Sequence, residues 1–203
     1  MKKMMLLMGV LLVITAAACA QESRQEASIS YEGIAGPQVY GNAVTQTSTI
    51  GGGFLASYRY MVTPRSSIEA NYGWAHNSQK FSTSSLSSGR VHTRQQEISG
   101  AYVYSRNYHN FNPFLEAGVG ALIFSALEDS GTSFLDAKRQ TTVGGLFGGG
   151  VAYELSPSFD LRLEYRGLLA KAPDFKLVSG ANNLNTSRYE WYSAPVFGIA
   201  YHF

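Results

Sequence analysis

Two residues, His76 and Ser78, have the types and the spacing that could support nucleophilic catalysis. A histidine can act as the base that activates a serine hydroxyl, so a His-x-Ser pair on one wall of a protein could carry out acyl transfer. A match this short is common by chance, and no acidic side chain stands nearby to orient the imidazole. We therefore predict no catalytic residues and keep an enzyme as an alternative.

Carboxylates and arginines that occupy every second position form another chemical candidate. Two carboxylates can mimic the acid and base of a glycosidase, but the interspersed arginines favour structural ion pairs. The predicted network consists of Arg59, Glu69, Glu116, Glu154, Asp160, Arg162, Glu164 and Arg166, and Glu190 shares its parity.

No other cluster in the sequence indicates a cofactor or a metal. The four histidines do not have the spacing of metal ligands. The glycine-rich run at 144–150 lacks the Lys-Ser/Thr that follows the glycines of a phosphate-binding loop. We therefore predict no cofactor and interpret these glycines as sites of tight packing.

The elements that carry the charged residues are predicted to be strands, because apolar and polar residues alternate with period two. Phe159, Leu161, Leu163 and Tyr165 alternate with charged residues, so one face of this segment is apolar and the other is charged. The same pattern predicts eight strands, at 28–38, 54–62, 68–74, 98–104, 113–124, 143–153, 159–165 and 189–203.

The connections between these strands alternate in length. Turn-forming residues predict short turns, and the polar segments between the other strands predict long loops. The short turns are at 63–66, 107–112 and 155–158, and the long loops are at 40–47, 79–92, 127–138 and 171–187. Short turns at one end and long loops at the other are typical of outer-membrane barrels.

Residues 1–20 are predicted to be a signal peptide, and residues 21–203 a single barrel domain. Two lysines precede an apolar stretch that ends in small residues around Cys19. That stretch is about 22 Å long as a helix, which is shorter than the roughly 30 Å hydrocarbon core. An acylated Cys19 is the alternative. Without Lys2 and Lys3, 14 of the 16 basic residues remain against 14 acidic ones, a balance that does not favour nucleic-acid binding.

Burial in a membrane explains the alternation. In hydrocarbon every backbone polar group needs an internal partner, and a sheet achieves this by closing into a barrel. Eight strands leave a lumen that side chains can fill. A lipid-facing Arg or Lys costs about 2–4 kcal/mol at the midplane, so we expect the charged face inside and the aromatic face outside. A soluble lipocalin-like barrel with the opposite orientation is a further alternative.

The last ten residues resemble the C-terminal assembly signal of outer-membrane proteins. The resemblance rests on Phe203 and on Phe197, Ile199 and Tyr201, which share its parity. In architecture the chain is similar to the small barrels of the outer membrane protein A and X type. This resemblance implies an all-β, eight-stranded antiparallel up-and-down transmembrane β-barrel in the outer membrane, whose last strand is engaged by the barrel-assembly machinery.

The resemblance implies a structural or surface-recognition role through the extracellular loops, without enzymatic activity. The expected contacts are outer-membrane lipid and lipopolysaccharide. The resemblance implies a porin-like architecture, although the charged residues themselves favour a lumenal salt-bridge network over a channel. Some similar barrels are lipid A deacylases with a serine and a histidine on the outer wall, but the residues around His76 and Ser78 do not match their motif.

Overall fold

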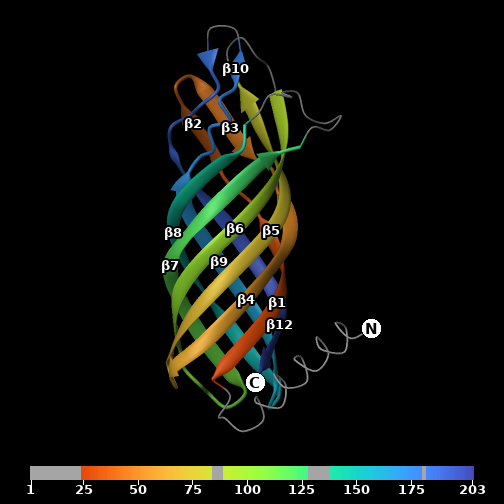
Figure 1. Ribbon diagram of the computed structural model, residues 1–203, viewed down its shortest axis with the longest axis vertical. Coiled ribbons are helices and arrows are strands. Elements are labelled where there is room, and N and C mark those ends of the chain that lie inside the picture. The colour runs from red at the N-terminus through yellow and green to blue at the C-terminus, as the bar shows by residue number, and fades with distance from the viewer. Residues whose placement is uncertain (1–23, 84–88, 128–137, 180–181) are drawn as a thin grey trace, which may run out of the picture.

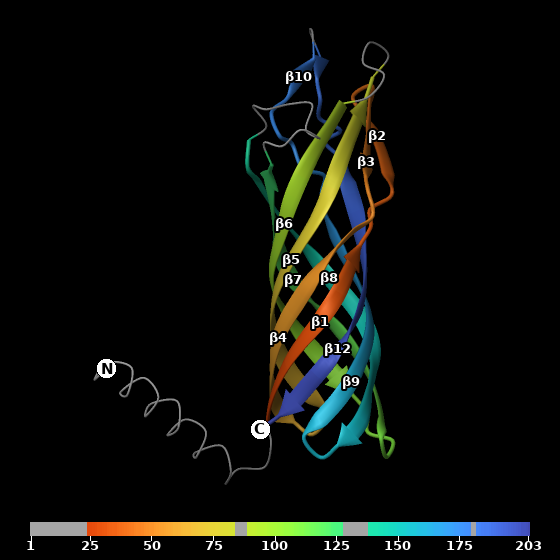
Figure 2. The ribbon, with the colours of Figure 1, turned by 90° about the vertical axis from the view of Figure 1, so that its right-hand side faces the viewer.

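The chain forms a closed barrel of eight antiparallel strands (Figures 1 and 2). The computed structural model describes residues 24–83, 89–127, 138–179 and 182–203, so the expected signal peptide lies outside the described residues. The barrel strands are β1 (Gln25–Ile34), β4 (Gly51–Thr63), β5 (Ser66–Ser82), β6 (Gly89–Ser105), β7 (Phe111–Ala126), β8 (Gln140–Ser156), β9 (Phe159–Lys171) and β12 (Tyr189–His202). The predicted fold class is confirmed.

Each barrel strand pairs with its neighbours along the chain, and β1 pairs with β12 to close the circle. In the closing pair Ile29 lies opposite Ile199, and on the other side of β12 Phe197 lies opposite Leu163. Closure gives the edge strands partners, which a membrane interior requires. Among the described residues no helix is long and apolar enough to span a membrane.

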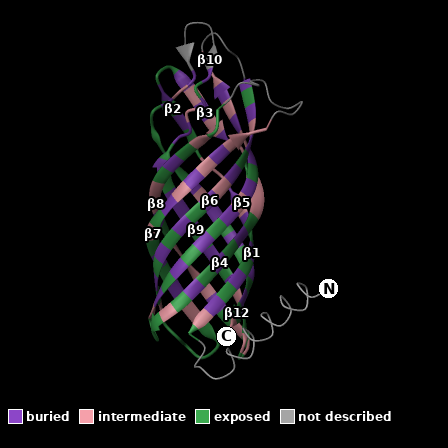
Figure 3. Ribbon diagram, viewed as in Figure 1, coloured by how far each residue is buried: buried purple, intermediate pink, exposed green. Residues whose placement is uncertain are grey.

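Side chains alternate between lumen and outer surface along every barrel strand (Figure 3). In β9, Leu163 is 58 % exposed, whereas its neighbours Arg162 and Glu164 are almost completely buried. Leu115 and Val119 of β7 are likewise exposed on the outside. An apolar outer wall around a charged interior is the reverse of a lipocalin-like barrel, so the soluble alternative is wrong.

Short turns connect the strands at one end of the barrel, as predicted. β4 and β5 are joined through Pro64 and Arg65, and β8 and β9 through Pro157 and Ser158. The C-terminus lies at the same end (Figure 1). In barrels of this kind the short turns are periplasmic.

Two of the predicted long loops contain additional strand structure. The prediction of a loop at 40–47 is wrong. β2 (Gln38–Gly41) and β3 (Val44–Ser48) form a hairpin there, and β3 pairs with β5. The loop predicted at 79–92 is longer than the observed one, because β5 and β6 remain paired as far as Phe81 and Gly89. Polar residues concealed these extensions, since both faces of a strand outside the membrane can be polar.

The segment at 172–188, which we call the cap, folds into the outer mouth of the barrel. The prediction of a polar loop here is wrong, because Phe175, Leu177 and Leu184 are buried. The cap also contains the two-residue strands β10 (Val178–Ser179) and β11 (Asn182–Asn183), which pair with each other. Most of the loop predicted at 127–138 lies outside the described residues.

Candidate functional site

The lumen toward the periplasmic end is filled by ion pairs centred on Arg162. Its guanidinium nitrogens lie 3.1 Å from Glu26, 3.2 Å from Glu69 and 3.1 Å from Glu164. Arg59 shares two of these acids, at 2.7 Å from Glu69 and 3.6 Å from Glu26. Each arginine therefore neutralises carboxylates from several strands, which connects opposite walls of the barrel.

A second cluster of ion pairs surrounds Arg166, which lies four residues after Arg162 on β9. Arg166 is completely buried, and its guanidinium lies 2.9 Å from Glu97, 3.1 Å from Glu116 and 3.2 Å from Glu164. Glu164 therefore joins both clusters. The single ring of Phe114 is also in contact with the network, since the guanidinium carbons of Arg59 and Arg162 lie 4.8 and 5.1 Å from its centroid. Such cation–π contacts strengthen when water is excluded.

The structure brings together six of the eight residues that the sequence assigned to the network. Asp160 is instead 3.0 Å from His202, and Glu154 has no ion pair among the described residues. Both lie at the periplasmic mouth of the lumen. Asp160 therefore makes a lumenal ion pair with His202 instead of an arginine, and the place of Glu154 in the network stays a prediction.

Sequence reasoning missed three buried acids of the lumen, Glu26, Glu32 and Glu97. A signal was present in β1, where Glu26, Ser28, Ser30 and Glu32 share one parity and apolar residues the other. The weak alternation elsewhere in this strand concealed it. Glu32 differs from the other two, because neither of its carboxylate oxygens has a hydrogen-bond partner.

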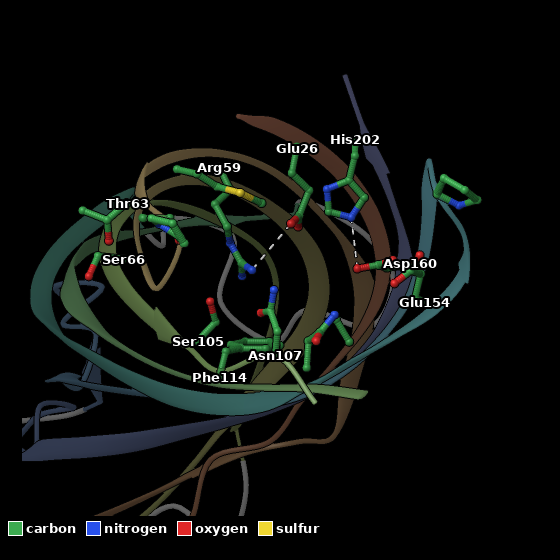
Figure 4. Close-up of a pocket in the computed structure, with 16 residues that line it drawn as sticks. Glu26, Arg59, Thr63, Ser66, Ser105, Asn107, Phe114, Glu154, Asp160 and His202 are labelled. Carbon is green, nitrogen blue, oxygen red and sulfur yellow. Dashed lines mark ion pairs between the residues drawn. The ribbon is translucent and has the colours of Figure 1, made fainter. Parts of the chain in front are cut away.

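A polar vestibule opens at the periplasmic end of the lumen (Figure 4). It encloses about 230 Å³, and its lining includes Asn107, Glu154 and the Asp160–His202 pair. Arg59 and Glu26 form its inner boundary, where the ion-pair network begins. The vestibule therefore borders the ion-pair network at its inner end.

The outer half of the lumen contains a hydrophobic cluster beside buried polar side chains such as Gln79 and Thr93. Phe175 of the cap packs edge-on against Phe81 and Phe124, with ring centroids 6.2 and 6.4 Å apart. Tyr192 and Leu184 belong to the same buried cluster. The cap thus closes the barrel from outside by hydrophobic contact.

His76 and Ser78 lie on the outer wall, on the same face of β5. Two residues of one parity in a strand are about 6.6 Å apart along the chain. The His76 ring packs against Trp74, with centroids 4.5 Å apart, and the Ser78 amide donates to Thr49 Oγ1 at 2.8 Å. Along the described β5 and β6, no carboxylate occupies this face. In the part of the chain that is described, no three His, Cys, Asp or Glu side chains are grouped to hold a metal ion.

The residues of the predicted assembly signal lie on the lipid-facing side of β12. Phe197, Ile199 and Tyr201 are exposed, and Phe203 stacks on Tyr201 with ring centroids 5.9 Å apart. β12 also completes the barrel by pairing with β1. Engagement of this strand by the assembly machinery stays a prediction.

Comparison with known proteins gives a family match over most of the chain. A family model described as the outer membrane protein beta-barrel domain matches residues 6–203. A search of curated protein sequences found no match.

Several solved outer-membrane structures share the fold. OprG from Pseudomonas aeruginosa has a TM-score of 0.65 at 12% identity, over 90% of this chain and 97% of that one. Neisserial surface protein A has a TM-score of 0.58 at 17% identity, over 89% and 98%. Ail of Yersinia pestis, crystallised with the heparin analogue sucrose octasulfate, has a TM-score of 0.51 at 16% identity, over 89% and 99%. Given the family match, the chain belongs to the outer membrane protein beta-barrel family and is an outer-membrane protein.

Proposed function

We propose that this protein is a closed, non-enzymatic barrel that displays a rigid recognition surface outside the cell. The observation that carries the proposal is the folded cap: Phe175, Leu177 and Leu184 form a core with lumenal residues of the barrel. A segment held by its own apolar core keeps one shape, which recognition of a partner favours.

Ordered backbone structure around the cap supports the same function. The β2–β3 hairpin is paired to β5, and Asn42 Nδ2 donates to the carbonyl oxygen of Asn185 at 3.0 Å. Thr186 Oγ1 is 3.5 Å from Gln46 Oε1. Hairpin and cap therefore form one surface.

The described residues that are not buried are mostly basic, which suggests an anionic partner. Three of the 14 described basic residues are buried, against eight of the 10 described acidic residues. Arg139 and Arg188 are exposed at the outer rim, next to β8 and β12. Because Ail was crystallised with a heparin analogue, a sulfated glycan is a suitable first probe.

The test is adhesion of intact cells to a heparin-coated surface. Cells that produce the protein should adhere more strongly than cells that lack it, and an R139E/R188E variant should lose the difference. An R65E/R106E variant carries the same change of charge, but on the periplasmic turns, and should adhere like wild type. Equal adhesion with and without the protein, on heparin-coated and uncoated surfaces, would count against recognition of this kind.

A Ser78→Ala variant separates the proposal from a lipid-modifying enzyme. We expect mass spectra of lipid A to be the same in cells with the wild type, with the variant and without the protein. Loss of an acyl chain only in cells with the wild-type protein would establish the enzymatic alternative.

A further inference from the structure

The periplasmic mouth of the barrel contains two cavities that share a wall. The vestibule lies inside the lumen, and a second cavity of about 230 Å³ lies between the β4–β5 and β6–β7 turns. Each is larger than the roughly 30 Å³ that a water molecule occupies in the liquid. Pro64 and Asn107 line both cavities, so a single ligand can occupy the two at once.

The vestibule contains a pair of acids that is only partly compensated. Glu154 of β8 lies directly opposite Asp160 of β9, and both line the cavity (Figure 4). Like charges directly opposite each other on paired strands are destabilising. His202 contacts Asp160 at 3.0 Å, whereas the Glu154 side chain has no ion pair among the described residues. A cation beside Glu154 therefore relieves the repulsion.

Two further polar groups of the vestibule lack a partner in the described part of the chain. Asn112 Oδ1 accepts no hydrogen bond, and Asn112 lies opposite Ala152, two residues before Glu154 on the same face of β8. Ser67 is 3 % exposed and lines the cavity from β5, and its hydroxyl has no hydrogen-bond partner there. A carboxylate, an amide oxygen and a hydroxyl all accept hydrogen bonds, and a primary ammonium group has three donors. The vestibule is therefore suited to a primary amine.

The second cavity has the opposite charge. Its lining includes Arg65 and Arg106, one from each turn, and none of its described lining residues is acidic. The two turns are held together, because the Ser105 amide donates to the Arg65 carbonyl oxygen at 2.9 Å. The Arg106 guanidinium carbon lies 5.9 Å from the centroid of the Tyr108 ring, and neither arginine has an ion pair with the described residues. A guanidinium binds a carboxylate through two parallel hydrogen bonds, so this cavity is suited to a carboxylate.

We propose that the periplasmic mouth binds a short peptide whose amino and carboxyl ends are both free. The amino end enters the vestibule beside Glu154, and the carboxylate binds Arg65 and Arg106. A fully extended tripeptide spans at most about 10 Å, so its two ends can lie in adjoining cavities. The acidic cavity is inside the barrel, so the ligand enters from the aqueous periplasm rather than from the surrounding lipid. This site is at the opposite end of the barrel from the cap and does not depend on recognition there.

The experiment is an NMR titration of the full-length mature protein in neutral detergent with trialanine. A Glu154→Gln variant should bind trialanine about tenfold more weakly than wild type, because one charge-assisted hydrogen bond is weakened. An R65Q/R106Q variant should lose affinity to a similar extent, because the carboxylate loses its partners. An R139Q/R188Q variant loses the same charge at the outer rim and should bind like wild type. The heat-dependent gel shift verifies that each variant is folded.

Peptides that are blocked at one end test the proposal without any change to the protein. N-acetyl-trialanine lacks the ammonium group, so it should bind wild type about tenfold more weakly than trialanine and should not distinguish Glu154→Gln from wild type. Trialanine amide lacks the carboxylate and should likewise not distinguish R65Q/R106Q from wild type. Phosphoethanolamine, the headgroup of a zwitterionic lipid, should bind more weakly than trialanine.

Four results would each overturn the proposal. They are absence of trialanine binding to wild type, equal binding of the blocked and free peptides, unchanged trialanine binding by Glu154→Gln, and tighter binding of phosphoethanolamine than of trialanine. The last of these would assign the site to a lipid headgroup instead of a peptide.

Discussion

Arg162 shows how charged side chains remain stable inside the barrel. Its guanidinium contacts three carboxylates from different strands, and the ring of Phe114 lies 5.1 Å away. A buried charge is costly unless it is paired and hydrogen-bonded. Arg162 therefore offsets the energetic cost of burying these carboxylates in the lumen.

Replacing Arg162 with alanine should lower the free energy of unfolding by about 3–5 kcal/mol, because it leaves buried carboxylates without a partner. Urea unfolding of the protein in lipid vesicles measures this change. An Arg106→Ala variant removes an exposed arginine from a periplasmic turn and serves as the matched control. Equal stability of the two variants would show that water solvates the lumenal acids.

Replacing Glu32 with glutamine is expected to have a different effect on stability from replacing Glu69. Neither oxygen of Glu32 has a hydrogen-bond partner, whereas Glu69 pairs with both Arg59 and Arg162. A Glu32→Gln variant should be as stable as wild type or more stable, because it removes a buried carboxyl group that has no hydrogen-bond partner. Glu69→Gln should be less stable, because it removes the partner of two buried arginines. The same urea titration compares them, and a Glu32→Gln variant that unfolds at lower urea would contradict the assignment.

Ala43 is a position where the backbone favours glycine. Asn42 and Ala43 form the turn of the β2–β3 hairpin with φ of 54° and 59°. Two-residue hairpin turns with positive φ at both positions favour Asn-Gly. Ala43→Gly should slow amide hydrogen exchange in the hairpin about fivefold, equivalent to about 1 kcal/mol. Ala43→Val is the contrasting variant and should accelerate exchange; similar rates in both would show that this turn carries no strain.

At the scale of the elements, the strands within the membrane were predictable and their outer ends were not. Lipid on one side and a filled lumen on the other impose strict alternation, as in β9 and β12. Outside the membrane that constraint ends, so the residues at 79–82 and 89–92 look polar although they are paired.

The cap could not be predicted because its pattern is not periodic. Phe175, Leu177 and Leu184 are isolated among polar residues in the sequence. Their burial depends on the outer lumen, which brings Phe81 and Phe124 from distant strands to the same place. The charged network was easier to predict because its members lie on regular strands, although the pairing of each acid depended on depth in the barrel.

The cap should detach when its apolar core is broken. Phe175→Asp places a charge in a buried cluster, so we expect the cap to open while the lower barrel, held by its own ion pairs, stays closed. A broad-specificity protease added to proteoliposomes should cut the variant at 172–188 and leave wild type intact. Tyr40→Asp, at an exposed position of β2, is the control. Resistance of the Phe175 variant would mean that the cap is held by other contacts.

At the scale of the whole molecule, the separation of charge defines the protein. The lumen contains eight of the described acids and three arginines, and most of the basic residues are outside. Among the described residues, the network and the cap occupy the lumen beyond the vestibule. These features support our proposal of a scaffold that presents surfaces.

The barrel as a unit should resist SDS at room temperature, because its backbone hydrogen bonds are closed in a circle. Unheated protein should migrate differently from boiled protein on an SDS gel, because only the boiled protein is unfolded. Identical migration before and after boiling would argue against a closed barrel. A planar-bilayer recording on the same sample should show no stable ion conductance.

The most direct test of the central claim is labelling of single cysteines on intact cells with a membrane-impermeant thiol reagent. Cys19, the one cysteine of the chain, lies in the expected signal peptide, so introduced cysteines report alone. Asn42→Cys, on the hairpin beside the cap, should be labelled at once. Asn107→Cys, at a short turn, should be labelled only after the outer membrane is permeabilised. Labelling of Asn107→Cys but not Asn42→Cys on intact cells would contradict a barrel that displays its cap to the outside.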